Sequence, residues 1–251
     1  MSESLEQVRT TGPDRTSDLR RQRSITSWFN QTYATRGLAY LRPEQAYEVF
    51  SHILGLTKEH ALLDVACGPG LFLEQALQRG AQACGVDISE VAVALAQQRS
   101  QAAMLAVGSA DKLPYADSTF DCVSCLGSLE RFLSAQSALG EMHRVIRRDG
   151  KLLVMVRNSL TPSWQAIAKL GIGNQTGHQG AASLNHWQGL IEAAGFVVVD
   201  VYPDQWPLMR WQRLRHYMGA SADFTSVRRG HLPLRFANEL IFLCKKPGAS
   251  R

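Results

Sequence analysis

The sequence predicts an α/β fold built on a doubly wound, mostly parallel sheet. Short apolar runs alternate with helical patterns from Ala61 to Arg157, as such a sheet requires. Residues 62–70, reading LLDVACGPG, carry an apolar strand into a glycine-bearing turn. A second apolar run, 83–86, ends in the acidic residue Asp87. These three observations are typical of a sheet that binds a nucleotide at the carboxyl ends of its strands.

The turn after the first strand is the most informative stretch. Residues 62–65 are the predicted strand, and Gly68 and Gly70 let the backbone bend sharply and approach a ligand closely. Residues 71–79 are the predicted helix that follows, whose free N-terminal amides would face the bound group. Taken alone, the glycine pair is equally well explained by an ordinary tight turn.

Later units add further pieces in the same order. Asp87 is placed to accept hydrogen bonds from both ribose hydroxyls, and Ser89 is a suitable N-cap for the next helix. Ala110 and Asp111 follow a short apolar run. The seven predicted strands are 62–65, 83–86, 104–107, 120–126, 152–156, 196–202 and 240–244.

With these residues the chain resembles a class I S-adenosylmethionine-dependent methyltransferase. The resemblance is to the small-molecule type that includes the ubiquinone and menaquinone methyltransferases, and it covers about residues 60–200 plus the final strand. It implies the Rossmann-like methyltransferase fold and S-adenosylmethionine as the cofactor. Motif I of the family, an acidic residue followed by a glycine-rich turn, falls on Asp64, Ala66, Gly68 and Gly70.

The resemblance also implies how the cofactor is held. In this family the turn wraps the methionine part, and the acidic residue, here Asp64, helps to hold its amino group. Asp87 then binds the ribose, Ile88 packs on the adenine, and Asp111, beside Ala110, contacts the adenine amino group. The expected cofactor-binding residues are Asp64, Ala66, Gly68, Gly70, Asp87, Ile88, Ala110, Asp111 and, at the end of the fourth strand, Leu126.

The chain departs from the family pattern at two places. Ala66 stands where a first glycine is common. Within residues 141–152, which match a helix, a turn and the fifth strand, residues 148–150 replace a proline-glycine-glycine turn. Neither departure should abolish cofactor binding, because a small residue and a turn former are still present. A nicotinamide dehydrogenase is the competing interpretation, but the turn lacks its third glycine and Asp111 has no role in it.

Length and composition suit one domain with a small accessory part, since the chain has 251 residues and 45% hydrophobic content. No run approaches the ~20 apolar residues of a membrane span, and the N-terminus has no apolar block of a secretory signal, so we expect a cytoplasmic protein. The expected parts are a loose tail (1–24), a helical cap of two helices (25–58), a methyltransferase domain (59–245) with insertions at 158–182 and 203–235, and a second tail (246–251). The cap either folds over the cofactor, as in the family that the chain resembles, or simply packs against the sheet. Together with the loops after the fourth and fifth strands, including residues 126–132, and the second insertion, it is expected to build the acceptor pocket. The first insertion is either a lid or a disordered span.

Charge is concentrated late in the chain. The net charge is +5, and residues 203–235 hold six arginines against two acids. The interleaved aromatics and arginines of 206–217 fit a cap helix with solvated arginines, an anionic acceptor site or an anionic membrane surface. Cys122 and Cys125 form a lone C-x-x-C in an apolar run, which favours core packing over a zinc or redox site, and no metal site is predicted.

The expected reaction is methyl transfer from S-adenosylmethionine to a small-molecule, lipid-linked or glycan-linked acceptor. Direct displacement at oxygen, without metal, is favoured over carbon or nitrogen, since positioning and desolvation supply most of the acceleration. If the acceptor is a hydroxyl, His178 is the first candidate base and Glu130 the second. The alternatives are a solvated loop histidine and a salt bridge from Glu130 to Arg131 or another arginine.

Two other functions stay open at this point. An RNA or other nucleic-acid methyltransferase is suggested only by the pI near 9.1 and the basic segment, and residues 126–129 (LGSL) lack the proline-rich motif of base-modifying enzymes. A cofactor-binding subunit without catalysis is disfavoured by the intact Asp64, Asp87 and Asp111. The sequence does not indicate an oligomeric state.

Overall fold

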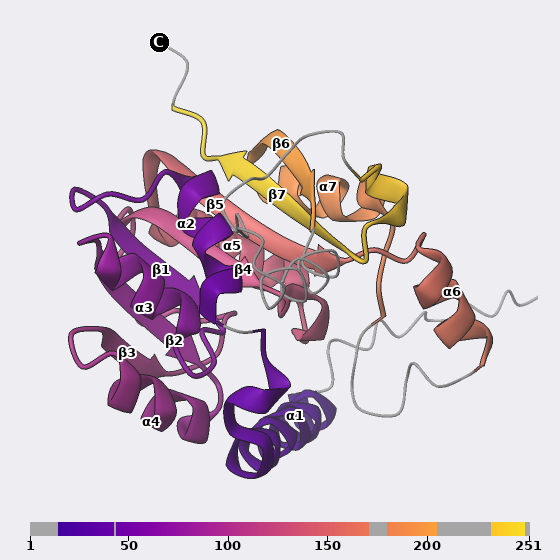
Figure 1. Cartoon of the computed structure of the whole chain (residues 1–251), viewed down its shortest axis with the longest axis horizontal. Coiled ribbons are helices and arrows are strands. Elements are labelled where there is room, and N and C mark those ends of the chain that lie inside the picture. Colours follow the sequence, from indigo (N-terminus) through magenta and orange to yellow (C-terminus); the bar gives the residue numbers. More distant parts are fainter. Residues whose placement is uncertain (1–14, 43, 171–179, 205–231, 249–251) are drawn as a thin grey trace, which may run out of the picture.

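The computed structural model describes residues 15–42, 44–170, 180–204 and 232–248, and its centre is a seven-stranded sheet (Figure 1). The strand order is β3-β2-β1-β4-β5-β7-β6, and β7 runs antiparallel to both of its neighbours while the other neighbouring strands pair in parallel. This confirms the predicted doubly wound α/β fold. The strands are β1 (Ala61–Val65), β2 (Gln82–Asp87), β3 (Met104–Val107), β4 (Phe120–Leu126), β5 (Ile146–Arg157), β6 (Val197–Pro203) and β7 (Glu239–Lys245).

Helices cover both faces of the sheet. One face packs on α2 and α3 through Phe50 and Phe72, and the other packs on α5 and α7 through Met142 and Trp187 (Figure 1). The α-helices are α1 (Arg15–Arg36), α2 (Glu48–Leu54), α3 (Leu71–Gln78), α4 (Glu90–Arg99), α5 (Ala135–Val145), α6 (Pro162–Lys169) and α7 (Leu184–Ala193); the 3-10 helices are η1 (Gly37–Tyr40), η2 (Glu44–Tyr47), η3 (Leu129–Arg131) and η4 (Leu234–Phe236). None of the described helices is long and apolar enough to cross a membrane.

The helix that follows β2 begins at its predicted cap. The Ser89 hydroxyl accepts a hydrogen bond from the Ala92 amide at 3.1 Å, which satisfies one of the free amides at the start of α4. The Ser183 hydroxyl does the same for the His186 amide at 3.3 Å in α7. In each of the two helices, one local residue therefore determines where the helix begins.

The predicted loose tail is wrong for residues 15–24, which form the first turns of α1. Gln22, Ile25, Phe29 and Tyr33 are spaced by three or four residues, so they lie on one helix face, and all four line the same pocket. Residues 19–23 are mostly good helix formers, so the helix extends outward from this packed face. Residues 1–14 lie outside the described part of the chain.

The other boundaries also need correction. The insertion 158–182 is not without structure, because it contains α6, and an isolated bridge joins Asn158 to Ala182 at its two ends. Lys246 is not part of a loose tail, because its ammonium group donates to the carbonyls of His143 at 2.8 Å and Ile146 at 2.9 Å. Most of the second insertion, 205–231, lies outside the described residues.

Candidate functional site

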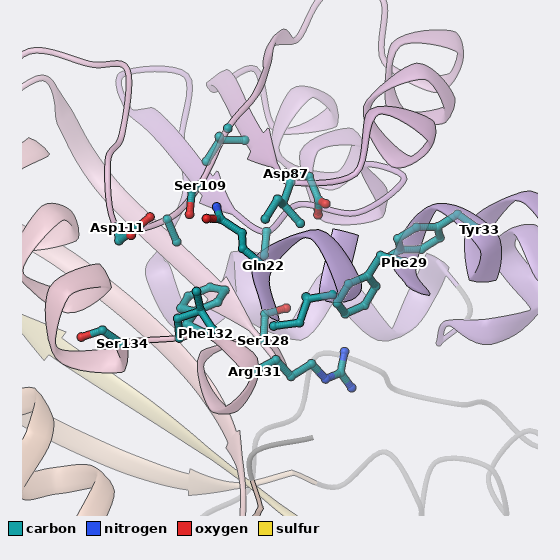
Figure 2. A pocket seen from close by; sticks show the side chains of 17 residues that line it. Gln22, Phe29, Tyr33, Asp87, Ser109, Asp111, Ser128, Arg131, Phe132 and Ser134 are labelled. Atoms are coloured by element: carbon teal, nitrogen blue, oxygen red, sulfur yellow. The ribbon is translucent and has the colours of Figure 1, made fainter. Parts of the chain in front are cut away.

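A pocket lies at the carboxyl ends of the strands on the β1 and β2 side of the sheet (Figure 2). Its empty volume is about 730 Å³ including its opening to solvent, which is within the usual size of a small-molecule site. One helix, α1, lies over it, and loops that follow the strands form the rest of its wall. The lining residues are Gln22, Ile25, Phe29, Tyr33, Ala66, Val86, Asp87, Ile88, Gly108, Ser109, Ala110, Asp111, Ser128, Arg131, Phe132, Leu133 and Ser134.

The turn after β1 takes the sharp course that its glycines predict. Gly68 and Gly70 have φ angles of +53° and +80°, a region that L side chains rarely adopt. A Cβ atom on Gly70 would also lie 3.0 Å from the Cβ atom of Ala96. Ala66 has a φ of 59° as well, so this position is strained, which is the physical reason for a glycine there in other sequences.

Asp87 fastens this turn to the tip of β2. One carboxylate oxygen accepts from the Gly68 amide at 2.8 Å and the other from the Ser89 amide at 2.9 Å. The side chain is buried, which raises the pKa of Asp87 against the lowering effect of these amides. The Ser89 hydroxyl donates to the Asn30 side chain at 2.6 Å, which ties α1 to the same strand tip. Asp87 thus combines a structural role with a place in the pocket wall.

Asp64 lies beneath the turn, at 3% exposure. Burial raises its pKa to about 7, against the opposing hydrogen bond from the Ser124 hydroxyl at 2.6 Å, and the nearby charge of Asp87 adds to the rise. Asp64 does not line the pocket described above. Its carboxyl is therefore a buried, protonatable group next to the cofactor turn.

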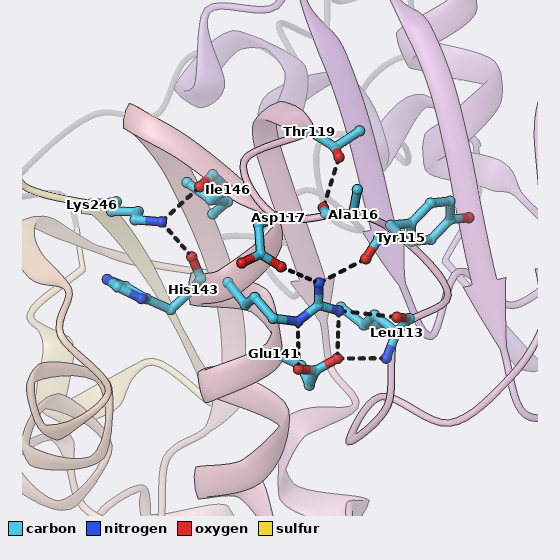
Figure 3. A network of polar contacts seen from close by, with 10 residues as sticks. Leu113, Tyr115, Ala116, Asp117, Thr119, Glu141, His143, Ile146 and Lys246 are labelled. Atoms are coloured by element: carbon cyan, nitrogen blue, oxygen red, sulfur yellow. Dashed lines mark hydrogen bonds and ion pairs between the residues drawn. The ribbon is translucent and has the colours of Figure 1, made fainter.

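The loop that carries Asp111 is held by an ionic network from α5 (Figure 3). Glu141 accepts from the Leu113 amide at 2.8 Å and from Arg144, whose hydrogen bonds are the main cause of the lowered pKa of Glu141. Arg144 in turn donates to the carbonyls of Leu113 at 3.1 Å and Tyr115 at 2.7 Å. The sequence indicated a helix at Glu141 but not this function, since the loop and the helix meet only in the fold.

The predicted cofactor residues divide into two groups. Ala66, Asp87, Ile88, Ala110 and Asp111 line the pocket, whereas Asp64, Gly68, Gly70 and Leu126 do not. Gly68 and Gly70 shape the turn instead, and Leu126 packs with the apolar cluster of α2 and α3. Ser128, two residues after Leu126, lines the pocket from the loop that follows β4.

The cap from Ile25 onward and the loop up to Phe132 were expected to line a pocket, whereas Gln22, Leu133 and Ser134 were not. The available signal was the stripe Gln22, Ile25, Phe29 and Tyr33, which begins inside the predicted tail. Its helical spacing is visible in the sequence, but its target on the sheet is not.

Of the two candidate bases, the structure describes only Glu130. His178 lies outside the described residues. The Glu130 side chain is 0% exposed and lies 3.5 Å from the Nε atom of Arg157, so the predicted ion pair is present. Neither carboxylate oxygen accepts a hydrogen bond from the described residues. Burial raises the pKa of Glu130, although the charges of Arg131 and Arg157 oppose the rise.

Metal and disulfide chemistry have no described site. Among the described residues no group of three or more His, Cys, Asp or Glu side chains is arranged to hold a metal ion. All five cysteines are free and buried, and Cys122 and Cys125 are core residues of β4. The lone C-x-x-C is part of the sheet core in this fold.

Comparison with known proteins identifies the central part of the chain. Residues 63–154 match the family described as "Methyltransferase domain". The uncharacterized methyltransferase YcgJ of Bacillus subtilis is 28% identical over 153 residues, which are 57% of this chain and 59% of that protein. The ubiquinone/menaquinone biosynthesis C-methyltransferase UbiE of Roseobacter denitrificans is 31% identical over 156 residues, 57% of this chain and 60% of that protein. The chain thus spans less than two thirds of the length of these relatives.

Solved structures show the same fold at lower identity. The 1,6-didemethyltoxoflavin-N1-methyltransferase of Burkholderia thailandensis, solved with 1,6-didemethyltoxoflavin and S-adenosylhomocysteine bound, has a TM-score of 0.63 at 16% identity, covering 99% of this chain and 94% of that one. The YcgJ structure has a TM-score of 0.59 at 19% identity, covering 81% of this chain and 99% of that one. The family match falls on the strands that carry the cofactor turn, so the central part of this chain, residues 63–154, matches a methyltransferase domain.

Proposed function

We propose that this protein transfers the methyl group of S-adenosylmethionine to a small-molecule acceptor. The observation that carries the proposal is the pocket itself, which presents the carboxylates of Asp87 and Asp111 at the strand ends of a methyltransferase domain. Both side chains are hydrogen-bond acceptors, and the adenosine part of the cofactor offers ribose hydroxyls and an adenine amino group as donors. The donor and acceptor groups of site and cofactor therefore match.

Each group at and around the pocket has a separate task in this proposal. Asp87 accepts from the ribose hydroxyls, Asp111 accepts from the adenine amino group, and Ile88 packs on the adenine ring. The buried carboxyl of Asp64 loses its proton to pair with the cofactor's ammonium group. Gly68 and Gly70 let the backbone lie against the methionine part.

Positioning and exclusion of water supply the catalysis. The bound cofactor supplies an electrophilic methyl group on a sulfonium, so no group of the chain has to activate the donor. The apolar side chains of Ile25, Phe29 and Phe132 line the pocket, and α1 covers it. Apolar side chains at these positions keep water from the donor and hold the reactants in line.

For the acceptor, we propose a hydroxyl that is methylated by direct displacement without metal. Glu130 and His178 are the candidate bases, and the raised pKa of Glu130 makes its carboxylate a stronger proton acceptor. The Glu130 side chain is fully buried and pairs with Arg157, so its contact with an acceptor requires a rearrangement that exposes it. Glu130→Gln tests the assignment: kcat falls strongly and cofactor affinity stays unchanged if Glu130 is the base, and an unchanged kcat contradicts it.

The relatives support a small molecule as the class of acceptor. UbiE acts in ubiquinone and menaquinone biosynthesis, according to its name, and the Burkholderia enzyme was solved with 1,6-didemethyltoxoflavin bound. We extend this class to lipid-linked and glycan-linked acceptors. We also propose that residues 206–217 contact an anionic membrane surface and that the protein is located in the cytoplasm. Vesicle sedimentation at low and high salt tests the membrane contact.

Calorimetric titration with S-adenosylhomocysteine tests the proposed function. Asp87→Asn should weaken binding about 100-fold, because the ribose loses a charged acceptor and the turn loses part of its support. Asp117→Asn is the matched control, since Asp117 is exposed and does not line the pocket, and its affinity should stay within about twofold of the parent. Failure of the parent protein to bind S-adenosylhomocysteine, or its binding of a nicotinamide dinucleotide instead, would contradict the proposal.

A further inference from the structure

One cation lines the pocket among the residues that the structure describes, and it is Arg131. The centre of its guanidinium lies 5.6 Å from the centroid of the Phe29 ring, so α1 and η3 meet at this pair. The Nε atom of Arg131 is buried and has no hydrogen-bond partner within the described chain. A buried donor without a partner is costly, and a ligand acceptor would satisfy it.

Arg131 and the proposed adenine site lie in different parts of the pocket. Figure 2 shows Asp111 and Ser109 together at one side of the pocket, with Arg131 at another, toward Phe29. The adenine is proposed to lie at Asp111, with Asp87 at the ribose. Arg131 is therefore placed toward the part of the cofactor that lies beyond its ribose.

The charges of the cofactor and the pocket complement each other. The methionine part carries the cofactor's carboxylate, whereas the groups that face Asp87 and Asp111 are hydrogen-bond donors. Burial of a carboxylate without a charged partner is strongly unfavourable. A guanidinium is the side chain best matched to a carboxylate, because it donates two parallel hydrogen bonds.

We propose that Arg131 binds the carboxylate of the cofactor's methionine part, with Phe29 holding the guanidinium in place. This inference rests on the proposed function, because it requires the cofactor in this pocket. It assigns α1 a direct part in cofactor affinity, since Phe29 belongs to that helix.

Calorimetry with two ligands tests the assignment. S-adenosylhomocysteine carries the carboxylate, and 5′-methylthioadenosine shares its adenosine and thioether but lacks the amino acid. Arg131→Gln should weaken S-adenosylhomocysteine binding about 10- to 100-fold, the loss expected for one charged hydrogen-bonded pair, and change 5′-methylthioadenosine binding less than about twofold. Arg131→Lys should recover part of the lost affinity, because it restores the charge without the fork.

Arg23→Gln is the matched control, because Arg23 is exposed on α1 and does not line this pocket. It removes the same charge and should leave both affinities within about twofold. An equal loss for the two ligands in Arg131→Gln would assign Arg131 to packing against Phe29, and no loss for either would remove it from the cofactor site. Retained 5′-methylthioadenosine binding shows that the variant is folded. If the parent protein binds neither ligand, the proposed function itself fails.

Discussion

The two halves of the sheet hold their polar groups by different means. On the cofactor side, around β1, β2 and β3, Asp87 is held by the backbone amides of Gly68 and Ser89, both within 19 positions of it. On the other side, Asp204 at the end of β6 is held by Arg42, which is 162 positions away in the chain. Backbone-held groups need only a local turn, whereas paired side chains need the whole fold to bring them together.

On the side of β5, β6 and β7, the ion pairs lie close to the same end of the sheet as the pocket. Arg42 donates at 2.9 Å to each carboxylate oxygen of Asp204, and it also pairs with Glu239 at the start of β7. Arg157 lies opposite Glu239 in the pairing of β5 with β7, and its side chain forms an ion pair with Glu130. The tip of β2 is thus specified by a local motif, whereas the Asp204 pair is specified by long-range electrostatics.

The largest effect should come from breaking the long-range pair. Arg42→Met should lower the free energy of unfolding by about 3–5 kcal/mol, because it leaves Asp204 and Glu239 as neighbouring acids with little exposure. Denaturant titration measures this loss. The control is Arg147→Met, whose pair with Asp121 at 2.7 Å is more exposed and should contribute at most about 1 kcal/mol. Equal losses in the two variants would break the comparison.

Close packing beneath the cofactor turn should give the next effect. A Cβ atom on Gly85 of β2 would lie 2.7 Å from Leu73, 2.8 Å from Cys67 and 2.9 Å from Leu105. Gly85→Ala should therefore lower the free energy of unfolding by about 1–3 kcal/mol.

The matched change is Gly140→Ala in α5, where the added methyl group meets no atom within 4 Å. It should stabilise the protein by about 0.5–1 kcal/mol, because alanine favours the helix. Thermal melts of both variants check the contrast, and stabilisation by Gly85→Ala would contradict the close approach of β2 to its neighbours.

The smallest expected effect is the pH dependence of the free energy of unfolding that comes from Asp64. The pKa of Asp64 is about 7 in the folded chain against an ordinary value of 3.8, so the folded state holds the proton more tightly. The stability from this group is fully present below about pH 4 and is lost as pH rises toward 7, with a loss of about 1 kcal/mol between pH 6 and pH 7.

Asp64→Asn should remove this part of the pH dependence, since the amide does not titrate but still accepts from Ser124. In the parent protein, affinity for S-adenosylhomocysteine should rise about eightfold from pH 6 to pH 7.5, because the deprotonated carboxylate pairs with the ligand's ammonium group. Identical pH profiles of stability for the parent and the variant would refute the buried titration.

Much of the cofactor half was predictable because its signals are local. Gly68 and Gly70 adopt positive φ angles, Ser89 caps α4, and Asp87 ends β2, as their neighbours in the sequence indicate. The first turns of α1 were missed, because the helix begins at Arg15 inside a polar segment whose packing partner is not visible in the sequence. Ser128 lines the pocket and Leu126 does not, since the end of a strand does not reveal which side chain turns into the pocket.

By itself, the sequence determined the alternation of strands and helices along the chain, the glycine turn and the acidic residue at the tip of β2. These follow from short-range backbone preferences and from the period of apolar residues, both of which are set by neighbouring residues. Only the tertiary structure decided that α1 covers the pocket, that Glu141 holds the Asp111 loop and that Arg42 joins Asp204. These are contacts between distant segments, and their geometry exists only once the sheet has brought the segments together.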